Sequence, residues 1–164
     1  MAAIAAAILA VDQFTKLLVV DAWPPGHAGV AVIPGFFRLV HFRNTGGAWG
    51  LLGGFPWFLT AFSIVAVLFI VWRGRWLVEG SRCRAVLIAC ILGGILGNLV
   101  DRLARGEVVD FLLFYLGKFA WPAFNVADSA ICVGVFGFVL VTLFAPEKGP
   151  ASGAEAGTEP KTGA

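Results

Sequence analysis

Residues 83–100 read CRAVLIACILGGILGNLV, an almost unbroken apolar run that ends at the polar pair Asp101-Arg102. The run approaches the roughly 20 residues that a helix needs to cross the hydrocarbon core of a bilayer. Its apolar residues are continuous and do not alternate with polar ones, which favours a helix over a barrel strand. The stretch therefore predicts a membrane-spanning helix.

Three more apolar runs surround it, at about 2–20, 55–72 and 125–145. Hydrophobic residues make up 59% of the 164 residues and charged residues 13%, whereas a soluble domain is about a quarter charged. A body this small cannot hide so much apolar surface. The sequence predicts one all-α membrane domain over 1–145 with four transmembrane helices. The first run lacks a basic start and contains Asp12 and Lys16, so we interpret it as a retained helix.

Loop charge predicts the orientation of these helices. The link 73–84 holds four arginines and one acid, the densest basic cluster, and should face the cytoplasm. Both termini would then be cytoplasmic, and segments 21–54 and 101–124 would face outward. The tail 146–164 is rich in Gly, Ala, Pro, Glu and Thr and is expected to be disordered. A net charge of +2 without an aromatic-interleaved basic stripe does not indicate nucleic-acid binding.

The outward segment 21–54 carries strand signals. Val30–Ile33 and Phe36–Phe42 are rich in β-branched and aromatic residues, and Pro34-Gly35 between them indicates a turn. We expect a small β-rich cradle on the outer membrane surface.

Ionisable residues inside apolar runs are costly, so each needs a reason. Asp12 and Lys16 are four residues apart and share a helix face; they form either a simple ion pair or a scaffold for a polar site. Asn98, Asp101 and Arg102 also share a face, which indicates either anchoring of a helix end or a polar cavity.

Asp110 is a lone carboxylate in an apolar segment and is compatible with a plain surface charge. Asn125 and Asp128 open the fourth apolar run, where Asn suits an N-cap and an acid suits the first turn. The predicted topology places Asp101, Asp110 and Asp128 at one depth near the outer face. Two adjacent carboxylates share a proton, so one can activate water while the other acts as acid. Spacing leaves open which two meet.

Other functions remain open at this point. Ser129 and Lys16 are candidates for a serine-lysine peptidase. Intramembrane Asp, Lys and Arg also suit a transporter or proton relay, and a small membrane scaffold would need no site at all. The three cysteines, Cys83, Cys90 and Cys132, form no C-x-x-C pair and indicate neither a disulfide framework nor a metal site.

Five motifs in order resemble those of bacterial lipoprotein signal peptidases, also called type II signal peptidases. They are Asp12-Gln-Phe-Thr-Lys16, Arg43-Asn-Thr-Gly-Gly-Ala-Trp49, Gly97-Asn-Leu-Val-Asp-Arg102, Val108-Val-Asp-Phe111 and Phe124-Asn-Val-Ala-Asp-Ser129. The resemblance covers the chain from about Asp12 to Gly134. Gly47 stands where the family often has Ala.

The resemblance implies a membrane aspartic endopeptidase, a hydrolase without metal or organic cofactor. Its substrates would be diacylglyceryl-modified prolipoproteins, cut just before the lipidated Cys. The catalytic pair would be Asp110 and Asp128. Supporting or substrate-binding positions would be Asn44, Asn98, Asp101, Arg102, Asn125, Asp12 and Lys16. We expect a monomer in the bacterial inner membrane, in contact with lipid, with its active site near the outer face.

Overall fold

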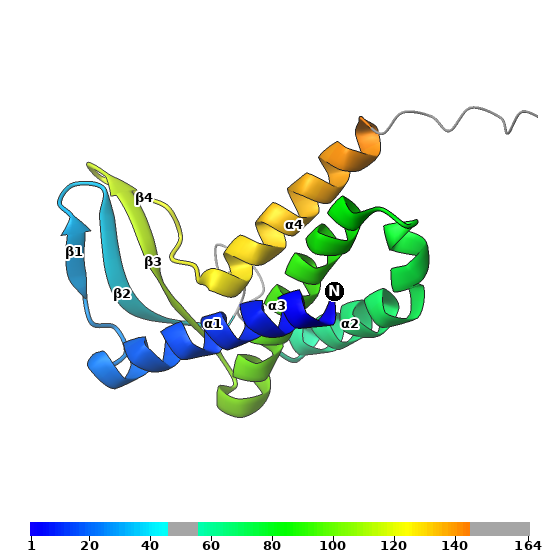
Figure 1. The fold of residues 1–164 in the computed structure, drawn as a ribbon. Helices are drawn as coiled ribbons and strands as arrows, with labels where there is room; N and C mark the ends of the chain where they lie inside the picture. Colours follow the sequence, from blue (N-terminus) through cyan, green and yellow to red (C-terminus); the bar gives the residue numbers. More distant parts are fainter. Residues whose placement is uncertain (46–55, 145–164) are drawn as a thin grey trace, which may run out of the picture.

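A computed structural model describes residues 1–45 and 56–144 and confirms the four predicted helices (Figure 1). Their bounds are α1 Ala2–Ala22, α2 Pro56–Val78, α3 Arg82–Arg105 and α4 Val126–Leu143. Each is long and apolar enough to cross a membrane. The predicted tail 146–164 lies outside the described residues, as do positions 46–54 of the predicted outer segment and with them Gly47 and Trp49.

Helix α3 is the centre of the bundle, because α1, α2 and α4 all pack against it. Glycines permit the close approach. A Cβ atom at Gly93 would lie 2.7 Å from the carbonyl oxygen of Ala5 in α1. One at Gly94 would lie 2.4 Å from the carbonyl oxygen of Ala127 in α4. Small residues at helix contacts are how membrane helices bring their backbones together.

The basic link between the second and third helices is shorter than the sequence indicated. Helix α2 continues to Val78, so Arg73 and Arg75 lie within it. Arginine stems can cover apolar surface while their heads stay at the membrane edge. The Arg73 guanidinium lies 5.1 Å from the ring centre of Trp72 and 5.0 Å from that of Trp76. This aromatic contact lets a charged residue extend the helix past the apolar run.

Four antiparallel strands form one sheet in the order β1-β2-β3-β4. Their bounds are β1 Val30–Ile33, β2 Phe37–Asn44, β3 Val108–Leu116 and β4 Phe119–Ala120. The two predicted strand segments are confirmed as the antiparallel pair β1 and β2, and Gly35 in the predicted turn between them has φ +82°. Strands β3 and β4 were not predicted.

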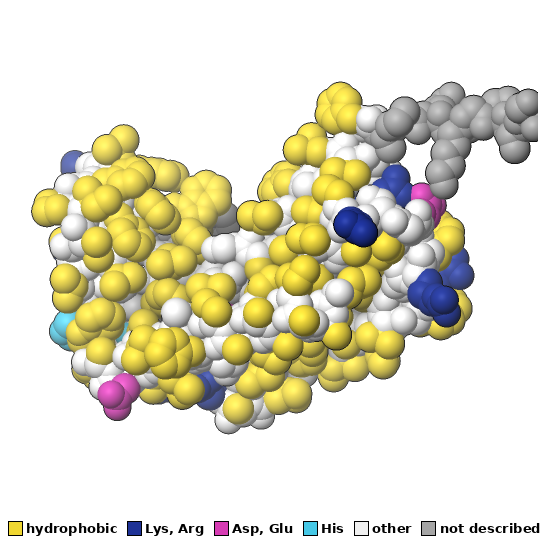
Figure 2. Space-filling view, in the orientation of Figure 1, with side chains coloured by type: hydrophobic (Ala, Val, Ile, Leu, Met, Phe, Trp, Pro, Cys, Tyr) yellow, Lys and Arg dark blue, Asp and Glu magenta, His cyan; other side chains and the backbone are white. Residues whose placement is uncertain are grey.

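The sheet lies at the C-terminal end of α1, beside the start of α4 (Figure 1). Val19 in α1 packs with Val109 and Phe111 of β3 in a small buried cluster. The rest of the surface in view is largely apolar (Figure 2). The first residues of β3 follow the end of α3 in the chain, and the Phe111 N–H donates to the Phe124 carbonyl at 3.0 Å, which brings them beside the start of α4.

Candidate active site

Helix α4 begins with a capping box that holds the Asp128 carboxylate. The Asn125 side chain accepts from the Asp128 N–H at 2.9 Å, and the Asp128 Oδ2 accepts from the Asn125 N–H at 3.3 Å. The predicted capping role is therefore present. It leaves Oδ1 of Asp128 free to accept a second bond, from the Asn98 amide at 2.7 Å. Capping and a site role are compatible in one side chain.

Asp110 is not a surface charge, since it is 2% exposed at the start of β3. Its carboxylate accepts from the Asn44 amide at 2.8 Å and from the Asn125 amide at 2.8 Å. Burial, and then the nearby charge of Asp128, raise the pKa of Asp110 to about 7, while the Asn44 and Asn125 hydrogen bonds oppose the rise. This carboxyl group can therefore hold a proton near neutral pH.

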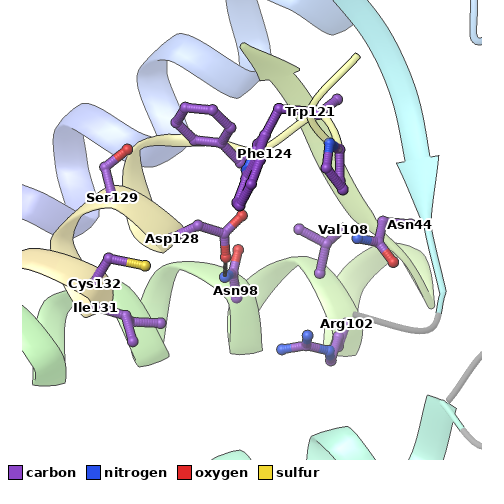
Figure 3. A pocket seen from close by; sticks show the side chains of 12 residues that line it. Asn44, Asn98, Arg102, Val108, Trp121, Phe124, Asp128, Ser129, Ile131 and Cys132 are labelled. Atoms are coloured by element: carbon purple, nitrogen blue, oxygen red, sulfur yellow. Dashed lines mark hydrogen bonds between the residues drawn. The ribbon is translucent and has the colours of Figure 1, made fainter. Parts of the chain in front are cut away.

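Two asparagines connect the carboxylates of Asp110 and Asp128. Asn125 donates to Asp110 and also to the Asn98 Oδ1 at 3.2 Å, while Asn98 donates to Asp128. Figure 3 shows Asn98 directly below Asp128, with the hydrogen bond between them. The two carboxylates thus share one network of amide donors from α3 and α4.

A fully buried ion cluster lies beneath this network. Lys16 Nζ is 2.8 Å from Asp12 and 2.9 Å from Asp101, and it donates to Asn98 at 3.0 Å. The predicted i, i+4 pair is therefore real and also serves as a scaffold. Asp12 accepts from the Ala127 N–H at 2.8 Å, and Asp101 accepts from the Val109 N–H at 3.2 Å. Each acid thus fixes the backbone beside one member of the pair above.

A cavity of about 440 Å³ opens beside Asp128, between the sheet and α4 (Figure 3). Its polar lining is Asn44, Asn98, Arg102, Asp128 and Ser129, and Trp121, Phe124 and Ile131 are part of its apolar lining. A second hollow of about 410 Å³, lined by residues of α2, α3 and α4, meets the first at Asn98, Arg102 and Asp128. A polar centre therefore stands where two largely apolar openings join.

Residues 4–144 match the sequence profile of the family described as Signal peptidase (SPase) II. The chain belongs to the signal peptidase II family. Curated relatives named lipoprotein signal peptidase agree. That of Desulforapulum autotrophicum is 45% identical and the match covers 84% of this chain and 87% of the relative. That of Syntrophotalea carbinolica is 46% identical over 80% and 83%, and one from Listeria monocytogenes is 38% identical over 87% and 91%.

Two solved structures have the same fold as this signal peptidase II chain, and both are described as bacterial membrane enzymes. One has a TM-score of 0.79 at 32% identity and covers 85% of each chain. The other has a TM-score of 0.76 at 32% identity and covers 87% of this chain and 92% of its own. The protein is therefore a peptidase and an integral membrane protein.

The candidate site of this signal peptidase II chain also contains two residues that the sequence analysis did not single out. The Gln13 amide donates to Gly97 O at 3.0 Å, Asp12 at 3.2 Å and Asp101 at 3.3 Å. Arg105 forms an ion pair with Asp101. Their positions offered a signal, because Gln13 is adjacent to Asp12 and Arg105 lies four residues after Asp101.

The serine-lysine alternative does not fit the contacts of this signal peptidase II chain. Lys16 is surrounded by Asp12, Asp101 and Asn98, while the Ser129 hydroxyl donates to the Asn125 carbonyl at 2.9 Å. A base must reach the hydroxyl that it activates. Within the described part of the chain, Lys16 and Ser129 make no contact of that kind.

Proposed function

We propose that this signal peptidase II chain is an aspartic endopeptidase that removes signal peptides from diacylglyceryl-modified prolipoproteins, cutting just before the lipidated Cys. The relatives' shared name, lipoprotein signal peptidase, supports the substrate class. The observation that carries the chemistry is the pair Asp110 and Asp128, held in one amide network, with Asp128 lining an accessible cavity.

The pair would work with one shared proton. The ionised carboxylate takes a proton from water, and the resulting hydroxide attacks the scissile carbonyl carbon. The protonated carboxyl group donates to the carbonyl oxygen, which gives a neutral tetrahedral intermediate. Collapse of that intermediate breaks the C–N bond. The proton taken from water passes to the departing amine, and a hydroxyl group of the intermediate returns its proton to the other carboxylate, which restores the singly protonated pair. The proton belongs to the pair and not to either acid alone.

The remaining site residues would position this pair or the substrate. Asn44 and Asn125 hold Asp110, and Asn98 holds Asp128. Asp101, Asp12 and Lys16 would act from below, through Asn98 and the backbones of β3 and α4. Arg102, which lines both hollows, can donate to substrate carbonyl oxygens.

The two hollows suggest how a lipid-embedded substrate would lie. A signal-peptide helix would occupy the groove along α2, α3 and α4, whose lining includes Phe62, Ile91 and Val135. The scissile bond would then reach Asp128 where the groove meets the cavity. We further propose that the protein is a monomer in the bacterial inner membrane, with both termini cytoplasmic and the site near the outer face.

The test is cleavage of a diacylglyceryl-modified prolipoprotein by the purified protein in detergent. We expect native protein to cut before the lipidated Cys, and Asp110→Asn and Asp128→Asn each to lose cleavage by more than about a hundredfold, because each acid has its own proton-transfer role. Folding of both variants is checked by thermal unfolding.

Two further variants separate the alternatives. Asp101→Asn should keep a measurable rate, since Asp101 lies behind the pair; a dead Asp101→Asn with an active Asp110→Asn would show that the pair is assigned wrongly. Ser129→Ala should remain active. A loss of cleavage in this variant would favour the serine-lysine alternative, because a peptidase cannot cut without its nucleophile. If native protein does not cut, the proposed substrate is wrong.

A further inference from the structure

A β-bulge lies in β2 directly beside Asp110. Leu39 pairs with Leu112, but the next paired residues are Phe42 and Asp110, so Val40 and His41 together oppose one residue of β3. Two residues opposite one define a bulge, and bulges often redirect side chains next to active sites.

The bulge decides which side chain faces Asp110. If the Leu39 register continued unbroken, His41 would lie opposite Asp110 and Arg43 opposite Val108. A one-residue shift exchanges the two faces of a strand. In the observed register Asn44 is opposite Val108, and it reaches diagonally to donate to Asp110 at 2.8 Å.

The exchange matters because Asn44 and Arg43 differ in charge. The amide of Asn44 is neutral and leaves Asp110 able to take up a proton. A guanidinium in the same place would favour the ionised carboxylate and keep the shared proton off it. In the observed register Arg43 is opposite Val109 and pairs with Glu107 at 2.7 Å.

His41 fastens the bulge to the end of α1. It is 1% exposed, and its Nδ1 lies 2.7 Å from the carbonyl oxygen of Trp23, the residue that caps α1. Because Nδ1 faces an acceptor, it carries the hydrogen. The His41 backbone also accepts from the Gly26 N–H at 2.8 Å and donates to the His27 carbonyl at 3.4 Å. Three hydrogen bonds thus hold the bulged residue on the segment that follows α1.

We propose that His41 is a positioning residue, which locks the register of β2 so that Asn44 and not Arg43 faces Asp110. The lock works at a distance from the substrate, through the strand. The meaning given to Asp110 rests on the proposed function, but the effect of His41 on register does not.

Disulfide formation between pairs of engineered cysteines on β2 and β3 reports the register of the two strands without an activity assay. In a chain with Cys83, Cys90 and Cys132 replaced by Ala, Arg43→Cys/Val109→Cys should form a disulfide in the observed register, since those residues are opposite. Arg43→Cys/Val108→Cys reports the shifted register. Adding His41→Leu should transfer crosslinking from the first pair to the second. His41→Asn, whose amide can still donate to the Trp23 carbonyl, should keep the first pair crosslinked.

The same His41 substitutions, without the cysteine changes, are then compared for cleavage. His41→Leu should slow cleavage about a hundredfold, the usual effect of a small misplacement, and His41→Asn should stay close to the native rate. Adding Arg43→Asn to His41→Leu supplies an amide in the shifted position and should recover most of the loss. If His41→Leu does not fold, His41→Gln is used in its place as the disrupting variant. Its longer side chain carries the amide past the Trp23 carbonyl, so the hydrogen bond is lost.

Three results would overturn the proposal. They are an unchanged crosslink pattern in His41→Leu, equal losses in His41→Leu and His41→Asn, and no recovery with Arg43→Asn. A native enzyme that does not cut the lipidated substrate would instead contradict the proposed function, and the crosslink pattern would still decide the role of His41.

Discussion

Lys16 has the most demanding surroundings of any side chain in the site. Its side chain is 0% exposed, and its ammonium group lies between Asp12, Asp101 and the Asn98 carbonyl oxygen. A charge in such a place is tolerable only with partners in good geometry. The position therefore admits few alternatives to a lysine, and its replacement should show directly how much the buried cluster contributes.

Replacing Lys16 by Met should lower the free energy of unfolding by about 3–5 kcal/mol, because it removes the ion pair of buried Asp12 and leaves buried Asp101 with Arg105 alone. Thermal unfolding in detergent measures the loss. The double variant Asp12→Asn/Lys16→Met removes one stranded charge, so its loss should be smaller than the sum of the two single losses. Additive losses would mean that the two side chains do not interact.

Asp110 predicts a pH dependence of stability. Burial and the nearby Asp128 raise the pKa of Asp110 from its ordinary value of 3.8 to about 7. Between these two pH values the folded state therefore holds a proton that the unfolded chain has lost. The free energy of unfolding therefore falls as pH rises through that window and levels off above it. Asp110→Asn is always neutral and escapes the fall. The melting temperature of Asp110→Asn should rise relative to that of native protein between pH 5 and pH 8. If the two melting temperatures changed in parallel with pH, Asp110 would not be the cause of the fall in stability.

At the scale of single elements, α3 owes its central place to glycines on two of its faces. Gly93 approaches α1, and Gly94 approaches the first turn of α4, which carries Asp128. The spacing of the helices and the position of the candidate site are therefore set by the same few residues.

Gly94→Ala should lower the melting temperature and slow cleavage, because its Cβ would lie 2.4 Å from the backbone oxygen of Ala127 and would move the start of α4. Gly74→Ala is the matched control in α2, since the nearest atom to its Cβ is the flexible end of Met1 at 4.0 Å. Alanine is favoured over glycine in helices by about 1 kcal/mol, so the control should be at least as stable as native protein. Equal effects would show that the contact with α4 is unimportant.

Apolar runs predicted the existence of all four helices but not all of their ends. Helix α2 continues beyond its apolar run because the Arg73 guanidinium contacts the rings of Trp72 and Trp76. Strand β3 was missed because Phe111-Leu-Leu-Phe114 does not alternate. Its pairing with β2 depends on residues about 70 positions earlier in the chain, and local pattern contains no information about such a partner.

For the molecule as a whole, the four spans predict one orientation. Loop charge places Lys118, beside β4, on the outside and Glu79, between α2 and α3, in the cytoplasm. In a chain with its native cysteines replaced, Lys118→Cys should react with a membrane-impermeant maleimide in intact spheroplasts. Glu79→Cys should react only after lysis. The reverse pattern would invert the topology and contradict a site at the outer face.

The sequence named candidate residues for the site, but it did not show which of them contact one another. Asp12 and Asn98 come from two helices, Asp110 comes from a strand, and Asn125 is the N-cap of α4. The sequence placed only Asp101, Asp110 and Asp128 at one depth. Asp110 was as compatible with a surface charge as with a site, because nothing near it in the chain is a partner. Its partners, Asn44 and Asn125, are brought to it by strand register and by the start of α4, which only the folded chain supplies.

The buried ion cluster also constrains how the protein can change over generations. Asp12, Asp101, Lys16 and Arg105 contribute two negative and two positive charges that cancel. A single replacement that alters the charge of Asp12, Asp101 or Lys16, whose side chains are fully buried, leaves a net charge that neither lipid nor water neutralises. Viable variants must therefore alter two charged positions at once, a path that mutation follows rarely. An inhibitor anchored on this corner would meet resistance slowly, because escape requires a coordinated pair of codon changes.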